Sequence, residues 1–383
     1  MKSPSPPNKT LTPLSAKVVQ SLRQSLIAWF KANGRSLPWR ETRQPYAVWL
    51  SEIMLQQTQV NTVVDYYHRF LARFPSIVSL ADAPQADVLK QWEGLGYYSR
   101  ARNLHKAAQL IRDQHHGVFP TQFDDIVALP GIGQSTAGAI ATFALMQPRP
   151  ILDGNVKRVL ARLMAIDAPI QEATTAKTMW PLSARLLPDD PEAAWQFNQA
   201  LMELGATCCT LKNPDCSRCP WQKTCQAYAR NLQGELPVSV KRKPVPHHDI
   251  GVAVLWKDET RQQCLIALRP QDGLLGGLWE FPGGKREADE TLPACVAREI
   301  MEEIGIEIAV GAKLTEIKHA YTHFKVTLHV YDCLYVSGTP QPKASQALQW
   351  VTLDEMSAYA FPKANNRIID LLKSNPAMQL TLC

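Results

Sequence analysis

Hydrophobic residues recur at three- and four-residue spacing through the first two thirds of the chain. The first run follows Ser15, a possible helix cap, and Asn33-Gly34 can supply the left-handed residue that ends this helix. Glycine and proline separate the later runs. These runs lie near residues 47–59, 60–73, 85–92, 100–115, 135–145, 155–164, 172–187 and 192–205. The pattern predicts an all-α domain with short connections over residues 15–229.

The periodicity changes after residue 229. Residues 230–248 are proline-rich, basic and aperiodic, which predicts a semi-extended linker. Alternating, β-branched stretches then predict strands, together with one strong helix over 292–304 and a final helix over 363–373. The expected strands cover 250–256, 262–269, 323–336 and 348–353. Residues 249–383 should therefore form an α+β domain.

Composition narrows the class of protein. The 383 residues are 45% hydrophobic and 20% charged, and the net charge of +6 favours a polyanionic partner. No apolar run reaches the length of a membrane span. Residues 1–14 are rich in proline and serine and lack an apolar signal-peptide core, so a disordered tail and no export are expected. Disulfides are then not expected either.

Four of the nine cysteines form a cluster in the sequence. Their spacing is C-x6-C-x2-C-x5-C, close after a helix expected to end at Gly205. Four thiolates in one loop make a soft tetrahedral site, and the spacing leaves open whether it holds a [4Fe–4S] cluster or zinc. The neighbouring Cys208 is expected to pack in the core. The four candidate ligands are Cys209, Cys216, Cys219 and Cys225.

A glycine turn and an aspartate follow one another in the helical region. The stretch LPGIGQSTAGAI (129–140) places Gly131 and Gly133 before a helix, where backbone N–H groups can bind a phosphate, although an ordinary turn has the same pattern. Further on, Asp153-Gly154-Asn155 can be a plain helix N-cap or can hold a carboxylate near bound DNA. The residues alone do not decide.

The hairpin, the downstream aspartate and the four-cysteine loop, in this order, resemble the endonuclease III superfamily of DNA glycosylases. LSEIMLQQTQV (50–60), GLGYYSRARNL (94–104) and the C-terminal domain resemble its MutY-type adenine DNA glycosylases, from about residue 20 onward. The resemblance implies a [4Fe–4S] cluster and removal of adenine from A:8-oxoguanine or A:G mispairs in double-stranded DNA. It also implies a monomer, located in the bacterial cytoplasm with the nucleoid.

Two carboxylates would carry the chemistry. By resemblance Glu52 is the general acid and Asp153 the carboxylate that stabilises positive charge on the sugar, with Asn155 beside it. Glu52 stands in an apolar helix, so its pKa should be raised unless it faces solvent on a polar stripe. The resemblance places the adenine pocket at Arg35, Leu37, Trp39, Arg40 and Gln199.

Other residues are expected to hold the DNA. The resemblance assigns Gln57 and Tyr97 as wedges beside the flipped nucleotide, and Gly131, Gly133 and Ser135 to the hairpin. Ser135 stands where strand-cleaving members carry a lysine, which implies a monofunctional enzyme. Lys241, Arg242 and Lys243 in the linker either contact phosphates or form a solvated spacer.

The last domain resembles the Nudix fold of MutT. Gly284, Glu290 and the run 298–306 follow the Nudix box, in which Glu299, Glu302 and Glu303 share a helical face suited to Mg²⁺. In the MutY family this domain is understood to recognise 8-oxoguanine, here through residues 321–323. That loop is Tyr321, Thr322 and His323.

Three alternatives remain open at this point. The Nudix box can be structural, or it can make the chain a second enzyme that hydrolyses nucleoside triphosphates. The chain can instead be a lesion-binding protein without catalysis. It can also act on oxidised pyrimidines like endonuclease III, which Ser135 and the C-terminal domain oppose.

Overall fold

The computed structural model describes residues 14–240, 244–321 and 324–374, and the chain divides into two compact units. The first unit holds residues 1–67 and 110–241, and the second holds residues 68–109 and 242–383. The expected tail (residues 1–13), linker residues 241–243 and loop residues 322–323 fall outside the described part of the chain.

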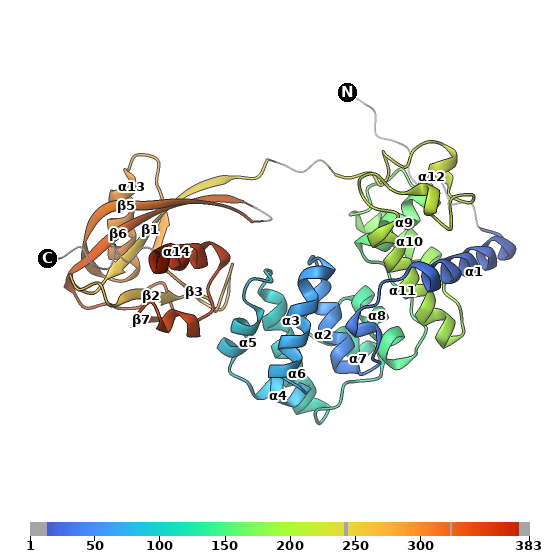
Figure 1. The fold of residues 1–383 in the computed structure, drawn as a ribbon, viewed down its shortest axis with the longest axis horizontal. Helices are drawn as coiled ribbons and strands as arrows, with labels where there is room; N and C mark the ends of the chain where they lie inside the picture. Colours follow the sequence, from blue (N-terminus) through green and yellow to red (C-terminus); the bar gives the residue numbers. More distant parts are fainter. Residues whose placement is uncertain (1–13, 241–243, 322–323, 375–383) are drawn as a thin grey trace. The chain divides into compact units, whose positions relative to one another are not determined.

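The first unit is helical, as the spacing predicted (Figure 1). Two helices, α3 (Val60–Arg73) and α6 (Ser99–Gln114), continue from one unit into the other. The helices within the first unit are α1 (Ala16–Asn33), α2 (Pro45–Leu55), α7 (Phe123–Ala128), α8 (Gln134–Leu145), α9 (Gly154–Leu163), α10 (Ala173–Leu186), α11 (Pro191–Thr207) and α12 (Gln226–Ala229), with 3-10 turns at Pro38–Arg40 and Cys216–Arg218. The short α7 was not expected, because six residues give too little periodicity.

Helix α1 begins as predicted and ends differently. Ser15 caps it by accepting a hydrogen bond from the Val18 N–H. Gly34, expected in a left-handed conformation, is extended instead, with φ −65°. A Cβ at this position would lie 2.7 Å from the Phe30 ring, so close packing rather than a left-handed turn requires the glycine.

A single apolar core joins α1, α9, α10 and α11. Leu26, Leu160, Phe197 and Leu204 are fully buried in it. Each such side chain stabilises the fold by about 1.5–3 kcal/mol relative to an exposed one. This core fixes the N-terminus of α9, where Asp153 lies, against α11.

The second unit combines helices with a seven-stranded mixed sheet in the order β3-β2-β1-β6-β5. Strands β1 and β6 are parallel, β4 pairs with β1, and β7 pairs with β2. The elements within this unit are α4 (Ile77–Asp82), α5 (Gln85–Trp92), β1 (His247–Trp256), β2 (Cys264–Leu268), β3 (Trp279–Glu280), β4 (Gly283–Lys285), α13 (Leu292–Glu303), β5 (Ile306–Ala320), β6 (Lys325–Gly338), β7 (Ala347–Val351) and α14 (Lys363–Ser374), with a 3-10 turn at Glu355–Ala358. The α+β prediction is confirmed, although β3, β4, β5 and α4 were not expected.

Strand β1 buries both of its faces. Val254 and Trp256 belong to an apolar cluster that includes residues of α14, whereas Ala253 and Leu255 belong to a cluster that includes residues of α13. Successive side chains of a strand point to opposite faces, so an apolar run is what a strand covered on both sides requires. The sheet is therefore the middle layer between two helices.

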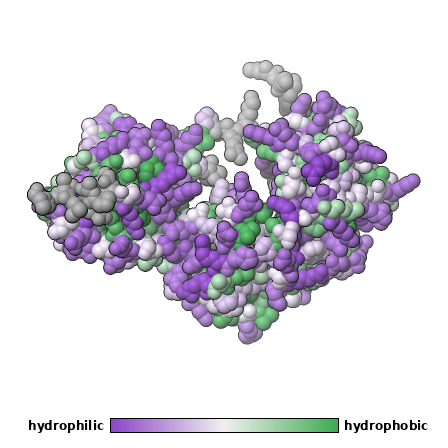
Figure 2. Space-filling view, in the orientation of Figure 1, coloured by the Kyte–Doolittle hydropathy of each residue, from purple (hydrophilic) through white to green (hydrophobic). Residues whose placement is uncertain are grey.

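The visible surface is mainly hydrophilic, with apolar residues scattered over it (Figure 2). In the described part of the chain, no helix is both long enough and apolar enough to cross a membrane. The eight cysteines in the described part of the chain are not joined by disulfides.

Candidate active site

Helix α2 carries a single acidic residue among apolar ones. Pro45 starts the helix, and Ile53 and Met54 beside Glu52 are buried. Glu52 itself is half-buried, and no side-chain hydrogen bond to it occurs among the described residues. Burial, helped by the nearby Asp153 carboxylate and opposed by Arg40, raises the pKa of Glu52 to about 8. The expectation of a raised pKa is confirmed.

Asp153 caps helix α9 and also lies near Glu52. Its Oδ1 accepts a hydrogen bond of 2.7 Å from the Val156 N–H. Burial raises the pKa of Asp153, while the hydrogen bonds from Val156 and Asn155 and the charge of Arg158 oppose that rise. The helix cap is therefore confirmed, and capping leaves the carboxylate near a second acid, while its place near bound DNA stays a prediction.

The environments of the two acids differ. Hydrogen bonds from Val156 and Asn155 favour the ionised form of Asp153, whereas the charge of Arg40 favours ionisation of Glu52. Repulsion from the Asp153 carboxylate adds to burial in raising the pKa of Glu52 to about 8, so Glu52 keeps its proton at neutral pH. A protonated acid near a carboxylate with hydrogen-bond donors is an arrangement suited to acid catalysis.

Arg158, on the same helix as Asn155, binds both the Asn155 side chain and the backbone of α11. Arg158 donates hydrogen bonds to the Asn155 Oδ1 (2.8 Å) and to the Gly205 carbonyl (2.6 Å). We expected helix α11 to end at Gly205, but it continues to Thr207. A Cβ on Gly205 would lie 2.7 Å from the Asn155 Cβ, so this glycine allows α11 to approach the start of α9.

A buried glutamate organises the expected adenine-pocket residues. Glu203 has no exposed side-chain surface and binds Arg35 (2.6 Å) and Arg40 (2.8 Å). Arg40 also donates to Gln199 Oε1 at 2.8 Å. Burial opposes ionisation, yet the hydrogen bonds from both arginines hold the pKa of Glu203 below its ordinary value.

The sequence reasoning missed Glu203. The spacing could have indicated it, because Glu203 follows Gln199 by one helical turn and so lies on the same face of the helix. The other pocket residues are apolar: Leu37 is buried, and the buried Trp39 contacts Tyr67 edge to face at 5.5 Å. The structure thus brings the arginines, Gln199 and Glu203 together.

We expect Glu203→Gln to destabilise the protein by about 3 kcal/mol, because removing one partner leaves buried arginine charge unpaired. Urea denaturation measures this change. Glu192→Gln is the matched control on the same helix, since Glu192 pairs with Arg43 at the surface and should change stability by less than about 1 kcal/mol. Equal, small effects of the two variants would contradict a structural role for the Glu203 cluster.

The hairpin is a glycine turn that joins α7 to α8. Gly131 lies in the turn between α7 and α8 with φ +80°, and Gly133 precedes the first residue of α8. The Ser135 Oγ accepts a hydrogen bond of 2.9 Å from the Leu152 N–H. Ser135 therefore ties the hairpin to the residue just before Asp153.

The two expected wedge residues share an unusual backbone. Gln57 (φ +58°) and Tyr97 (φ +48°) both adopt the left-handed region, and both are exposed, with Tyr97 at 44%. Gln57 belongs to the first unit and Tyr97 to the second. The neighbouring Tyr98 is buried. Strained, exposed residues of this kind are typical of binding loops.

The four-cysteine loop is organised around Arg162, a buried side chain of α9. Its guanidinium donates to the Cys209 Sγ (3.3 Å) and to the Thr210 carbonyl (2.6 Å), and its own carbonyl accepts from the Cys225 Sγ (3.3 Å). Burial, followed by the neighbouring thiols Cys219, Cys209 and Cys225, raises the pKa of Cys216. The four thiols thus lie near enough to influence one another. Cys208 packs in the core.

Across residues 14–240, 244–321 and 324–374, no three His, Cys, Asp or Glu side chains are placed to hold a single metal ion.

The Nudix box forms the loop and helix that its spacing predicts. Arg298 on α13 binds Glu290 (2.7 Å), Glu299 (3.1 Å) and Glu302 (2.9 Å). A Cβ on Gly284 would lie 2.1 Å from the Glu299 carboxyl carbon, so the glycine allows the loop to approach the helix. Burial, with repulsion from Glu280 and Glu299, raises the pKa of Glu303 to about 7.

Of the expected 8-oxoguanine loop, the structure describes Tyr321. Its ring packs against His319 and Phe324, with centroids 4.6 Å and 4.9 Å away.

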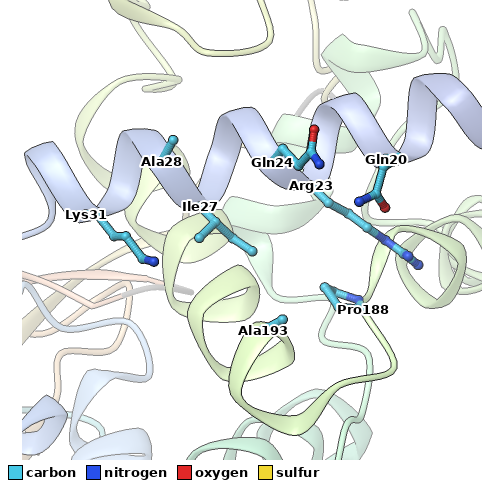
Figure 3. Close-up of a pocket in the computed structure, with 8 residues that line it drawn as sticks. All are labelled: Gln20, Arg23, Gln24, Ile27, Ala28, Lys31, Pro188 and Ala193. Carbon is cyan, nitrogen blue, oxygen red and sulfur yellow. The ribbon is translucent and has the colours of Figure 1, made fainter.

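A cavity of about 420 Å³ lies elsewhere in the first unit, between α1 and the start of α11. Arg23 and Ile27 line it from α1, and Pro188 and Ala193 line it from the other side (Figure 3). It contains no carboxylate, thiol or hydroxyl and none of the expected site residues. The paired acids, rather than this cavity, mark the candidate active site.

Residues 50–184, which hold Glu52, the hairpin and Asp153, match the HhH-GPD superfamily of base excision DNA repair proteins, and residues 251–371 match the NUDIX domain. The fold and site therefore define a DNA N-glycosylase with an attached Nudix-type domain. The chain belongs to the family of adenine DNA glycosylases.

Two relatives place it there, and one solved structure shares its helical fold. It is 34% identical to the adenine DNA glycosylase of Mus musculus, over 93% of this chain and 79% of that protein. It is 37% identical to that of Buchnera aphidicola (strain Bp), over 91% and 96%. The structure of a thermostable thymine-DNA glycosylase superposes with a TM-score of 0.51 at 25% identity, covering 55% of this chain and 97% of that one.

Proposed function

We propose that the chain excises adenine paired with 8-oxoguanine or guanine in double-stranded DNA. One observation carries the proposal: Asp153, at the start of α9, lies near enough to Glu52 on α2 for its charge to help burial raise the pKa of Glu52 to about 8. A target base inside a duplex is out of reach of such a site, so the adenine is flipped out of the stack first. Gln57 and Tyr97 are placed on exposed loops that suit wedges, where stacking on an aromatic ring contributes about 1–3 kcal/mol per base.

In the proposed mechanism, neutral Glu52 gives its proton to N7 of adenine while the bond between N9 and C1′ breaks. The bonding electrons leave with adenine, which is neutral after protonation, and the sugar becomes an oxocarbenium ion. Ionised Asp153 stabilises that positive charge. A water molecule then adds to C1′, and the proton that it releases restores neutral Glu52.

The proposed enzyme is monofunctional, because Ser135 has no amine that could form an imine with the sugar. In the structure the Ser135 hydroxyl is bound to the Leu152 N–H instead. We further propose that the Nudix-type domain reads the base opposite adenine through the loop at Tyr321. The contacts of Arg298 suit a structural role for the box, and no observation favours nucleotide hydrolysis.

We also propose that Cys209, Cys216, Cys219 and Cys225 hold a [4Fe–4S] cluster. When bound, such a cluster would cross-link the loop and can exchange one electron. The mutual influence of the four thiols and the contacts of Arg162 with Cys209 and Cys225 support this assignment. We expect purified protein to be brown and to contain iron rather than zinc by elemental analysis. Stoichiometric zinc without iron would refute the assignment.

The function is tested by single-turnover assays on duplexes with A:8-oxoguanine, A:G and C:8-oxoguanine pairs. We expect release of adenine from the first two duplexes and no release of cytosine from the third. The product should be an abasic site that breaks only after alkali, with little borohydride-trapped protein. Lys157 follows Asn155 closely, so trapping has to be quantified against strand cleavage. Binding of the first duplex without adenine release would instead indicate a lesion-binding protein.

A further inference from the structure

Three side chains from residues 90–98 bind the backbone of one short segment near the C-terminus, within the second unit. The Lys90 Nζ donates to the Tyr359 carbonyl (2.7 Å), and the Phe361 N–H donates to the Glu93 Oε1 (2.9 Å). The Tyr98 hydroxyl donates to the Phe361 carbonyl (3.3 Å). The segment 359–361 lies outside the helices and strands. The Ala360 carbonyl accepts from the Trp279 N–H of β3, whereas side chains bind the Tyr359 carbonyl and both backbone groups of Phe361.

Glu93 is the centre of this arrangement. Its Oε2 pairs with Lys90 (2.6 Å), and its Oε1 accepts a second hydrogen bond, from the Asn366 Nδ2 (2.9 Å). The side chain is 16% exposed, so its charge is largely removed from water. A separate contact, from the Arg102 Nη1 to the Gly276 carbonyl (2.7 Å), joins the same two parts of the chain. Lys90, Glu93 and Tyr98 are called the clamp below.

Each end of the clamp leads to a different loop. Tyr98 directly follows Tyr97, the exposed residue with a left-handed backbone. Phe361 is fully buried, stacks on Phe281 and belongs to the same apolar core against which Tyr321 packs. The clamp therefore connects the loop of Tyr97 to the core that supports Tyr321.

We propose that the clamp couples reading of the opposite base to flipping of adenine. Lys90, Glu93 and Tyr98 are positioning residues: they touch neither base and act by keeping the segment 359–361, with the core behind it, in register with the Tyr97 loop. This proposal rests on the proposed function, because it requires the Nudix-type domain to distinguish 8-oxoguanine from guanine. Without the clamp, that distinction is lost while the chemistry at Glu52 and Asp153 remains.

The test compares rates of adenine excision from A:8-oxoguanine and A:G duplexes under single-turnover conditions, with full-length protein. We expect Glu93→Ala and Tyr98→Phe each to lower the ratio of the two rates by roughly 5- to 20-fold, within the range of coupling between protein sites, and to leave the A:G rate within about twofold. Asp87→Ala is the matched control. Asp87 lies on α5, the helix that ends just before Glu93, and pairs with Arg73 at the surface (2.9 Å).

Hydrogen exchange at the Phe361 amide provides a second measurement. We expect faster exchange in Glu93→Ala, which removes its acceptor, and unchanged exchange in Asp87→Ala. If the substitutions lower the rate of adenine excision equally on both duplexes, the clamp is only a structural contact and the coupling is overturned. A changed ratio in Tyr98→Phe alone would place the effect in the hydrogen bond from the Gly94 N–H to the Tyr98 hydroxyl, and would also overturn it.

The outcomes separate the clamp from the function on which it rests. No adenine release by the unaltered protein refutes the proposed function itself. Equal rates of the unaltered protein on both duplexes refute opposite-base reading, and the coupling with it. A clear rate ratio in the unaltered protein that survives both substitutions refutes the clamp alone.

Discussion

Glu52→Gln is expected to lower the single-turnover rate of adenine release by roughly 10²- to 10⁴-fold, the contribution typical of a positioned general acid. Glutamine has nearly the same shape as glutamate and is neutral, like the protonated acid, so the apolar surroundings of α2 accept it. It has no proton of suitable acidity to give to N7 of adenine. The loss should therefore appear in the rate of the chemical step and not in the affinity for DNA.

The pH dependence of the reaction follows from the same residue. Burial raises the pKa of Glu52 to about 8, so the acid is protonated below that pH and loses its proton above it. The rate of adenine release by the unaltered protein should stay level towards neutral pH and fall as the pH rises through about 8. A rate that rises through this range would contradict an acid role for Glu52.

The free energy of unfolding should also depend on pH through the Glu52 proton. The folded protein keeps the Glu52 proton up to about pH 8, whereas an ordinary glutamate releases it near 4.5. Folded protein thus binds more protons than unfolded protein between these values, so this group lowers the free energy of unfolding as the pH rises through the window. Glu52→Gln should remove that contribution and be more stable than the unaltered protein at pH 8, by urea denaturation. Glu192→Gln, on the surface, is the control.

Local pattern was enough to predict most of the fold. Helical spacing located α1, α5 and α11, and the apolar run of β1 predicted a strand. The same reasoning predicted a raised pKa for Glu52, because large apolar neighbours in a helix imply desolvation. Strand β5 was missed, because its solvent-facing lysines and glutamates hide the alternation of buried residues.

Interactions between distant segments could not be predicted in this way. The approach of Asp153 to Glu52 depends on the packing of α9 against α11, where Gly205 leaves room for Asn155. The binding of two arginines by Glu203 depends equally on tertiary structure. Gly34 is a further example. Its sequence context suggested a left-handed turn, but glycine is required there because a Cβ would clash with Phe30.

Asp153 combines two roles that one substitution can separate. We expect Asp153→Asn to lower the rate of adenine release at least about 100-fold, as loss of one preorganised electrostatic contact at a developing charge does. Asparagine caps helices about as well as aspartate, so the free energy of unfolding should change by less than about 1 kcal/mol. Asp153→Ala removes the hydrogen bond to the Val156 N–H as well, and should cost a further ~1 kcal/mol of stability.

The matched control is Asp190→Asn, because Asp190 caps α11 through the Ala193 N–H (2.8 Å) in the same geometry and far less buried surroundings. It should leave both rate and stability nearly unchanged. Full activity of Asp153→Asn would reduce Asp153 to a helix cap and require another source of charge stabilisation. Low activity with an intact fold would instead show that the carboxylate charge, and not the cap, serves the reaction. Capping of α9 would then serve to hold the Asp153 charge near Glu52.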